Sequence, residues 1–117
     1  MYHIDFFERS DGSTPFQEYI DVMKEKMRAK TLRSLQLLRE FGPELREPNT
    51  KPLGDGIFEL RTILGSDAGR TLFFFFDGQT IVITHGFIKK TQKTPSREIE
   101  RAKKYRSEYM NRKQGAS

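Results

Sequence analysis

The chain has 117 residues and a formal net charge of +5. This length is typical of one domain, so we expect residues 1–117 to form a single unit with a frayed tail over 114–117. Cysteine is absent and there are two histidines, which excludes disulfides and thiolate chemistry and predicts no metal site and no cofactor. The sequence shows no signal peptide and no apolar run near the roughly 20 residues of a membrane helix, so we expect a cytoplasmic protein without membrane contact.

The first half of the chain predicts a strand and a helical hairpin. Residues 2–7 alternate between two faces, as expected of a strand. Thr14, followed by a proline and by a glutamine at the capping-box position, predicts the N-cap of a helix. Residues 24–30 are predicted to form an exposed bend before a second helix, which ends at Phe41 ahead of a Gly-Pro pair. Residues 43–56, rich in proline and glycine, predict a loop.

The second half predicts a strand meander and a terminal helix. Strands are predicted over residues 57–64, 70–76 and 80–88. Asp77-Gly78 favours a tight type I′ hairpin, and Thr94-Pro95 predicts the cap of a helix that runs to about Arg112. The order β-α-α-β-β-β-α predicts an α+β fold. In this fold the first strand completes a twisted, four-stranded antiparallel sheet, the helical hairpin covers one face, and the other face stays concave.

Charge is distributed unevenly along the chain. Residues 1–22 carry five acidic side chains against Arg9 alone, whereas residues 86–113 carry ten lysines and arginines against three glutamates. Such a basic segment is typical of a surface that binds polyanions, because cations displace the counterions condensed on phosphates. A solvated, lysine-rich terminal helix explains the same pattern equally well.

Cationic side chains are expected to gather where the predicted strands end. In strand 57–64 the period of two places Glu59 and Arg61 opposite an apolar face formed by Phe58 and Leu60. The sharp turns of the meander bring the neighbouring strands to the same region. The residues expected there are Lys51, Glu59, Arg61, Arg70, His85, Lys89, Lys90 and Lys93.

Four segments in this order resemble the RelE/ParE toxin superfamily, and most closely its HigB-like branch, which includes phage-derived proteins. They are Lys51-Pro52-Leu53, Phe58-Glu59-Leu60-Arg61, Gly69-Arg70 and the stretch from Gly86 to Pro95. The resemblance covers nearly the whole chain and implies a RelE-like fold. It also implies the toxin of a type II toxin-antitoxin system, a metal-independent endoribonuclease (mRNA interferase) that inhibits translation and growth. The implied partners are mRNA in the ribosomal A site and a helix-turn-helix antitoxin, with promoter DNA bound only by the antitoxin complex.

The residue types fit this chemistry. RNA cleavage without a metal requires deprotonation of the 2′-hydroxyl, neutralisation of the attacked phosphate and protonation of the leaving 5′-oxygen. Arg61 is the first candidate for the phosphate and Arg70 the second, since arginines supply fixed, forked donors, and the resemblance places function at both. Lys89 and Lys90 are the remaining catalytic candidates, as phosphate ligands or, where burial and nearby cations lower a lysine pKa, as acid or base.

Four more residues are predicted to contact RNA: Lys51, Lys93, Glu59 and His85. Glu59 is interpreted as a partner that orients the arginines rather than as the general base. His85 has an ordinary pKa suited to proton transfer, but its alternation with Ile81 and Ile83 favours a buried or edge position. The general base and acid are left open.

Two other functions remain open. A ParE-like toxin of the same fold acts on DNA gyrase and cleaves nothing, so its cationic cluster would not be needed to cut RNA. A non-catalytic nucleic-acid-binding module would use the basic helix on phosphates. In that case a change at Arg61 weakens binding no more than a change at any other basic residue, and affinity falls steeply with salt.

Overall fold

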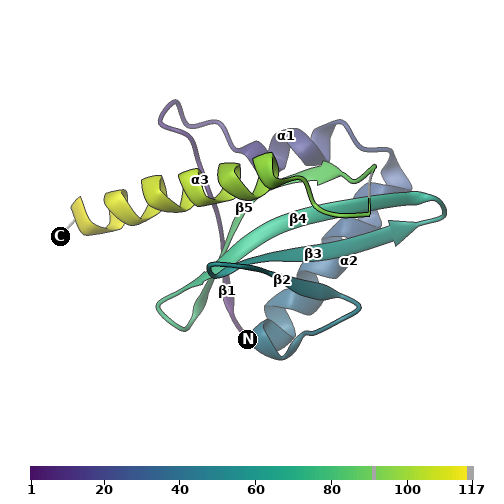
Figure 1. The fold of residues 1–117 in the computed structure, drawn as a ribbon, viewed down its shortest axis with the longest axis horizontal. Helices are drawn as coiled ribbons and strands as arrows, with labels where there is room; N and C mark the ends of the chain where they lie inside the picture. The colour runs from purple at the N-terminus through teal and green to yellow at the C-terminus, as the bar shows by residue number, and fades with distance from the viewer. Residues whose placement is uncertain (91, 116–117) are drawn as a thin grey trace.

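The computed structural model describes residues 1–90 and 92–115 (Figure 1). The elements in chain order are β1 (His3–Phe6), α1 (Pro15–Asp21), α2 (Glu25–Phe41), the 3-10 helix η1 (Gly42–Glu44), β2 (Thr50–Gly54), β3 (Ile57–Leu64), β4 (Asp67–Phe76), β5 (Thr80–Ile88) and α3 (Ser96–Gly115). The fold is α+β, as predicted, and is compatible with a RelE-like fold. Within the described ranges no helix combines the length and apolar character needed to cross a membrane.

The strands form one five-stranded sheet in the order β1-β5-β4-β3-β2. The predicted four-stranded antiparallel sheet is wrong in two respects. First, β1 pairs with β5 in parallel, with His3 opposite Thr80, which is possible because the long intervening chain supplies the crossover that parallel strands need. Second, the predicted loop 43–56 contains β2. Pro52 is tolerated there because β2 is an edge strand.

The meander follows the prediction closely. β3 and β5 have the predicted bounds, and β4 begins three residues before Arg70, at Asp67. Asp77 and Gly78 have φ angles of 54° and 77°. Positive φ at both residues is what a type I′ turn requires, and the turn lies where it was predicted. The register, however, pairs Phe76 with Thr80, so the loop has three residues instead of the two of a tight type I′ hairpin.

The connection between α1 and α2 is shorter than predicted. Because α2 begins at Glu25, most of the predicted bend over 24–30 is helical. The Arg28 side chain stabilises the connection by donating from Nε to the Ile20 carbonyl at 3.2 Å and from Nη2 to the Met23 carbonyl at 3.0 Å. These carbonyls lie at and just beyond the end of α1, where carbonyls run out of helical partners; that of Ile20 also accepts the Met23 N–H at 3.2 Å. Lys26 and Lys30 of this stretch lie exposed on α2, so their charge marks the solvent side of a helix and not a turn.

Helices cover both faces of the sheet (Figure 1). The hairpin of α1 and α2 packs on one face, where the core includes Leu60, Phe73 and Ile83. On the other face α3 buries Tyr105 and Tyr109 against the strands. The prediction that this second face stays open is wrong, because α3 carries an apolar stripe that buries itself on the sheet.

Two predicted helix caps do not act as caps. Thr14 occupies the N-cap position of α1, but its side chain makes no capping hydrogen bond. The Thr94 hydroxyl donates to Glu59 Oε1, and α3 begins later, at Ser96. At its other end α3 continues to Gly115, beyond the predicted end near Arg112 and into the tail that was predicted to fray. Residues 116–117 of that tail, and Thr91 of the motif, lie outside the described residues.

Candidate functional site

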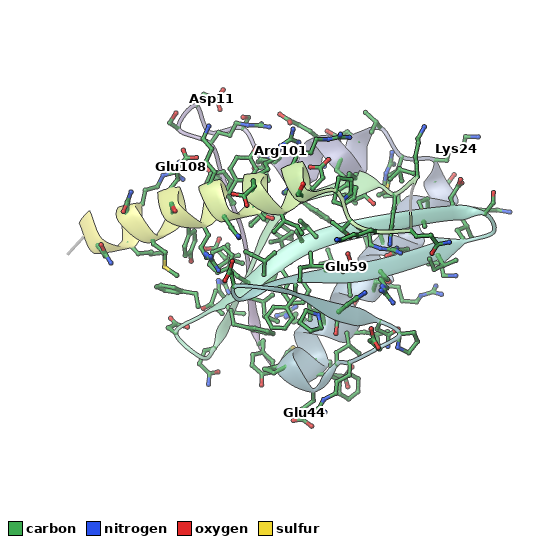
Figure 2. All side chains as sticks on the ribbon, viewed as in Figure 1. Asp11, Lys24, Glu44, Glu59, Arg101 and Glu108 are labelled. Carbon is green, nitrogen blue, oxygen red and sulfur yellow. The ribbon has the colours of Figure 1, made fainter. Side chains whose placement is uncertain are left out.

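A buried carboxylate lies at the centre of the candidate site (Figure 2). Glu59 on β3 is 1% exposed. Its Oε2 accepts a hydrogen bond from Arg61 Nε at 3.0 Å and lies 3.3 Å from Arg70 Nε. Its Oε1 accepts a hydrogen bond from the Thr94 hydroxyl. An unpaired carboxylate would be costly at this depth, so these partners are what allow Glu59 to be buried as a charge.

The two arginines lie directly opposite each other in the β3–β4 register. Like charges in such a pair destabilise a sheet, and the negative charge of Glu59 between them offsets this repulsion. The Arg61 side chain is 24% exposed, whereas Arg70 is buried and donates from Nη1 to the Gly69 carbonyl at 3.0 Å. Arg70 Nε is within ion-pair distance of Glu59 without hydrogen-bond geometry to any described residue. The pair therefore presents one arginine to solvent and holds the other beneath it.

Lys89 and Lys90 extend the cationic group beyond the end of β5. They line a cavity of about 450 Å³ together with Ala68, Arg70 and Gln92. Burial lowers the pKa of Lys89 below its usual value, and the nearby Arg70 charge lowers this pKa further. Burial also lowers the pKa of Arg70, an effect that Glu59 opposes. A lowered pKa makes Lys89 a stronger acid than an ordinary lysine, which is the direction that proton donation requires.

His85 does not lie on the predicted face of the sheet. In the β4–β5 register Phe73 pairs with Ile83 but Leu72 pairs with His85, so Thr84 is the extra residue of a β-bulge. The bulge breaks the alternation and turns His85 towards α3. There its Nε2 lies 3.1 Å from Glu98 Oε1 and its Nδ1 lies 3.1 Å from the Thr84 hydroxyl.

The burial of His85, in contrast, agrees with the predicted buried or edge position, since this side chain is 2% exposed. Burial is also the main reason that its pKa is lowered to about 4, which leaves the imidazole neutral near pH 7. The prediction that His85 contacts RNA finds no support in this arrangement, because α3 residues surround the ring.

The structure thus brings together Glu59, Arg61, Arg70 and Lys89 from three adjacent strands and their ends. Lys51 is exposed on β2, where it is the register partner of Glu59. Lys93 is exposed in the segment that precedes α3. Two contacts were missed from the sequence. Thr94 was interpreted only as a helix cap, and Glu98 carried no recognisable signal because its partner lies 13 residues away on another element.

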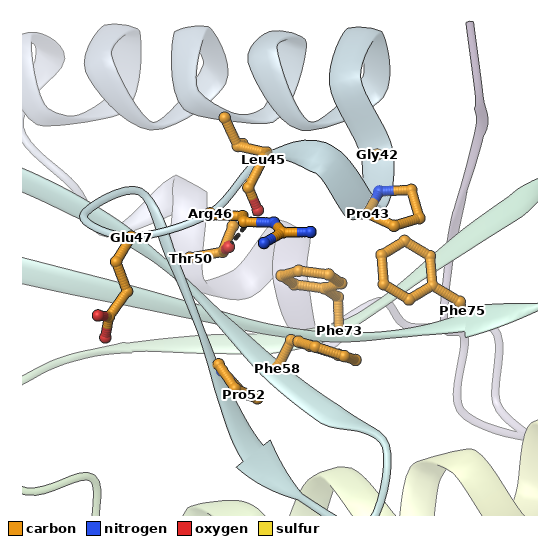
Figure 3. A pocket seen from close by; sticks show the side chains of 10 residues that line it. All are labelled: Gly42, Pro43, Leu45, Arg46, Glu47, Thr50, Pro52, Phe58, Phe73 and Phe75. Carbon is orange, nitrogen blue, oxygen red and sulfur yellow. Dashed lines mark hydrogen bonds between the residues drawn. The ribbon is translucent and has the colours of Figure 1, made fainter.

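The opposite face of the sheet carries a separate, more apolar cavity of about 520 Å³ (Figure 3). Three phenylalanine rings form its floor, and Figure 3 shows Pro43, Pro52 and the Arg46 side chain around them. Its lining residues are Gly42, Pro43, Leu45, Arg46, Glu47, Thr50, Pro52, Phe58, Phe73 and Phe75. Phe58 and Glu59 are neighbours that face opposite sides of β3, so this cavity and the arginine pair lie back to back.

The sequence profile of the family described as "Phage derived protein Gp49-like (DUF891)" matches residues 18–107, a range that includes every residue of the candidate site. The chain belongs to this family. The Gp49-like family is a RelE-like toxin family associated with toxin-antitoxin systems, which confirms the expected superfamily at this level. An antitoxin is the partner that such a family suggests. No curated protein sequence matches the chain.

Proposed function

We propose that this Gp49-like protein is a HigB-like toxin that cuts messenger RNA without a metal ion, in the ribosomal A site. The observation that carries the proposal is the pair of arginines held side by side by one buried carboxylate, next to a lysine whose pKa is lowered. Fixed cationic donors of this kind stabilise the charge that develops on a phosphate in the transition state. A surface that only attracts polyanions has no need of a buried carboxylate to orient its cations.

The proposed reaction is an internal transesterification. The 2′-hydroxyl loses its proton to a base from the solvent and its oxygen attacks the adjacent phosphorus, while Arg61 and Arg70 neutralise the phosphate oxygens. The bond from phosphorus to the 5′-oxygen then breaks, and Lys89 gives that oxygen a proton. The products are a 2′,3′-cyclic phosphate and a 5′-hydroxyl end. Lys90 is the remaining catalytic candidate, beside Lys89 in the same cavity.

The flanking cations bind the RNA strand on either side of the scissile phosphate. Lys51 lies on β2, next to Glu59 of β3, and Lys93 lies between β5 and α3. An RNA chain bound over the two arginines would therefore pass one of these lysines at each end of the site. The protein partner is a helix-turn-helix antitoxin that neutralises the toxin. Promoter DNA is contacted only through that complex.

The test is induced expression of the wild type, Arg61→Ala and Arg33→Ala, with growth recorded and the 5′ ends of cellular transcripts mapped. Arg33 is an exposed arginine on α2 and serves as the matched control. We expect growth arrest and new 5′-hydroxyl ends within messages for the wild type and Arg33→Ala, and neither for Arg61→Ala.

Two outcomes would contradict the proposal. Growth arrest without new transcript ends, unchanged in Arg61→Ala, would point to a gyrase-type target. RNA binding without cleavage that weakens equally in Arg61→Ala and Arg33→Ala, and falls steeply with salt, would indicate a non-catalytic binding module.

A further inference from the structure

We infer that Thr94 is a positioning residue of the site: its hydroxyl fixes the Glu59 carboxylate and thereby the guanidinium groups of Arg61 and Arg70. The inference rests on the proposed function, because it assigns the two arginines to the reacting phosphate. It concerns a residue that the sequence marked only as the start of a helix. Three observations carry it, namely the division of contacts between the two Glu59 oxygens, the depth of the Thr94 bond, and the anchoring of the segment that contains Thr94.

The two oxygens of Glu59 have different partners. Oε2 faces the Nε atoms of Arg61 and Arg70, at 3.0 and 3.3 Å, while the Thr94 hydroxyl donates to Oε1. The terminal torsion of a glutamate is soft and broad. A carboxylate held at one oxygen only can rotate about it, and the arginines would follow. Contacts at both oxygens define one orientation of the carboxylate plane.

The Thr94 bond is shielded from water. Thr94 is 5% exposed and Glu59 is 1% exposed, so a water molecule has little access to replace the hydroxyl. Hydrogen bonds to a buried charge are worth more than those at the surface, and a buried acceptor left without its donor is costly. Loss of the Thr94 hydroxyl alone should therefore change the orientation of the Glu59 carboxylate.

A second contact holds the segment that carries Thr94. Four residues further along, Glu98 Oε1 in the first turn of α3 lies 3.1 Å from His85 Nε2 on β5. Beyond it, Ala102 and Tyr105 of α3 are buried against the sheet. The start of α3 is thus tied to β5 through Glu98 and to β3 through Thr94. The Thr94 hydroxyl is presented to Glu59 from the segment that immediately precedes this packed helix, and not from β3, the strand that carries Glu59.

The geometry also explains which part of each arginine is left for a ligand. Glu59 engages Arg61 and Arg70 through Nε, which leaves the terminal Nη groups of Arg61 to bind a phosphate. Arg70 Nη1 is further held by the Gly69 carbonyl at 3.0 Å. The direction of these Nη groups depends on where Oε2 lies, and Oε2 moves when Oε1 is released. Thr94 thus acts on the phosphate ligands without contacting the phosphate.

The experiment compares Thr94→Val, which removes the hydroxyl at nearly constant shape, with Thr94→Ser, which restores it. Thr31→Val is the matched control, since Thr31 is equally buried and donates to the Met27 carbonyl on α2, away from the site. With purified protein and a short messenger RNA bound to ribosomes, Thr94→Val should lower kcat about tenfold and change KM much less, because oriented arginines act mainly on the transition state. Thr94→Ser should recover most of kcat, and Thr31→Val should keep it.

A second measurement does not depend on cleavage. In protein labelled with ¹⁵N-arginine, the Nε–H resonances of Arg61 and Arg70 should shift or broaden in Thr94→Val and stay in place in Thr31→Val. If the wild type cleaves RNA and Thr94→Val matches it in both kcat and arginine resonances, the inference is overturned and the proposed function stands. If no variant cleaves RNA but the resonances respond only to Thr94→Val, the positioning role stands and the proposed function fails.

Discussion

Folding stability should fall in mild acid because of one buried histidine. His85 is 2% exposed and its pKa is lowered to about 4, from an ordinary value of 6.5, first by burial. The charged groups facing it are Glu98 and Arg101 of α3 and Arg9 in the segment after β1. Glu98 raises its pKa and the two arginines lower it. The folded state therefore resists protonating His85 across a pH range in which the unfolded chain protonates it freely.

The difference between the His85 pKa in the folded and the unfolded state sets the direction and the size of the stability change with pH. Well above pH 6.5 neither state binds the proton, so the contribution to the free energy of unfolding is complete. As the pH falls towards the folded-state pKa of about 4, only the unfolded state gains the proton, and stability is lost. Between pH 7.5 and pH 5.5 this loss is about 1 kcal/mol, because the unfolded histidine becomes about nine-tenths protonated at one pH unit below its pKa.

The assay is urea unfolding at pH 7.5 and pH 5.5 of the wild type, His85→Gln and His3→Gln. His3 is the other histidine of the chain and is exposed on β1, which makes it the matched control. Carboxylates other than Glu98, which contacts His85, contribute alike in all three proteins and cancel in the comparison. The wild type and His3→Gln should lose about 1 kcal/mol more than His85→Gln on acidification. Equal losses in all three proteins would refute the reasoning, as would an NMR titration that placed the His85 pKa near 6.5 in the folded protein.

Two further changes probe the site and the core. Glu59→Gln keeps the shape of the side chain but leaves Arg61 and Arg70 facing each other without a counter-charge, so it should lower the free energy of unfolding by about 3 kcal/mol in urea denaturation and abolish RNA cleavage. Unchanged stability would show that Glu59 does not bear the charge assigned to it. Gly86→Ala would place a Cβ atom 2.2 Å from the Tyr19 ring, and should cost about 2 kcal/mol by thermal unfolding, whereas Gly115→Ala, with open space around it, should be neutral. A fully stable Gly86→Ala protein would contradict the close packing of Tyr19 on the sheet.

Local patterns in the sequence were sufficient for most of the elements. Alternation in residues 57–64 assigned Leu60 to the core and Glu59 and Arg61 to the opposite face, as the structure has them. The Asp77-Gly78 dipeptide located the hairpin because positive φ angles are a local property of those residue types. The same short-range reasoning brought the arginines of β3 and β4 to one place, since a tight meander leaves little choice of register.

Composition gave wrong secondary-structure predictions where a residue type occurs in more than one kind of element. Proline and glycine in residues 43–56 indicated a loop, yet Pro52 lies in an edge strand that does not need its missing N–H group. The charged residues of 24–30 indicated a bend, yet Lys26 and Lys30 lie on the solvent side of α2. Such choices depend on what packs against the segment, which a window of a few residues does not contain.

By itself, the sequence determined the α+β class, the bounds of β3 and β5, and the opposite faces of Glu59 and Phe58. These follow from backbone preferences and from periods of two and 3.6 residues. Tertiary structure alone decided that Thr94 donates to Glu59, 35 residues away, and that a bulge turns His85 towards Glu98. The physical reason is that these contacts depend on how α3 packs across the sheet, and that packing is the joint result of many side chains that no local pattern encodes.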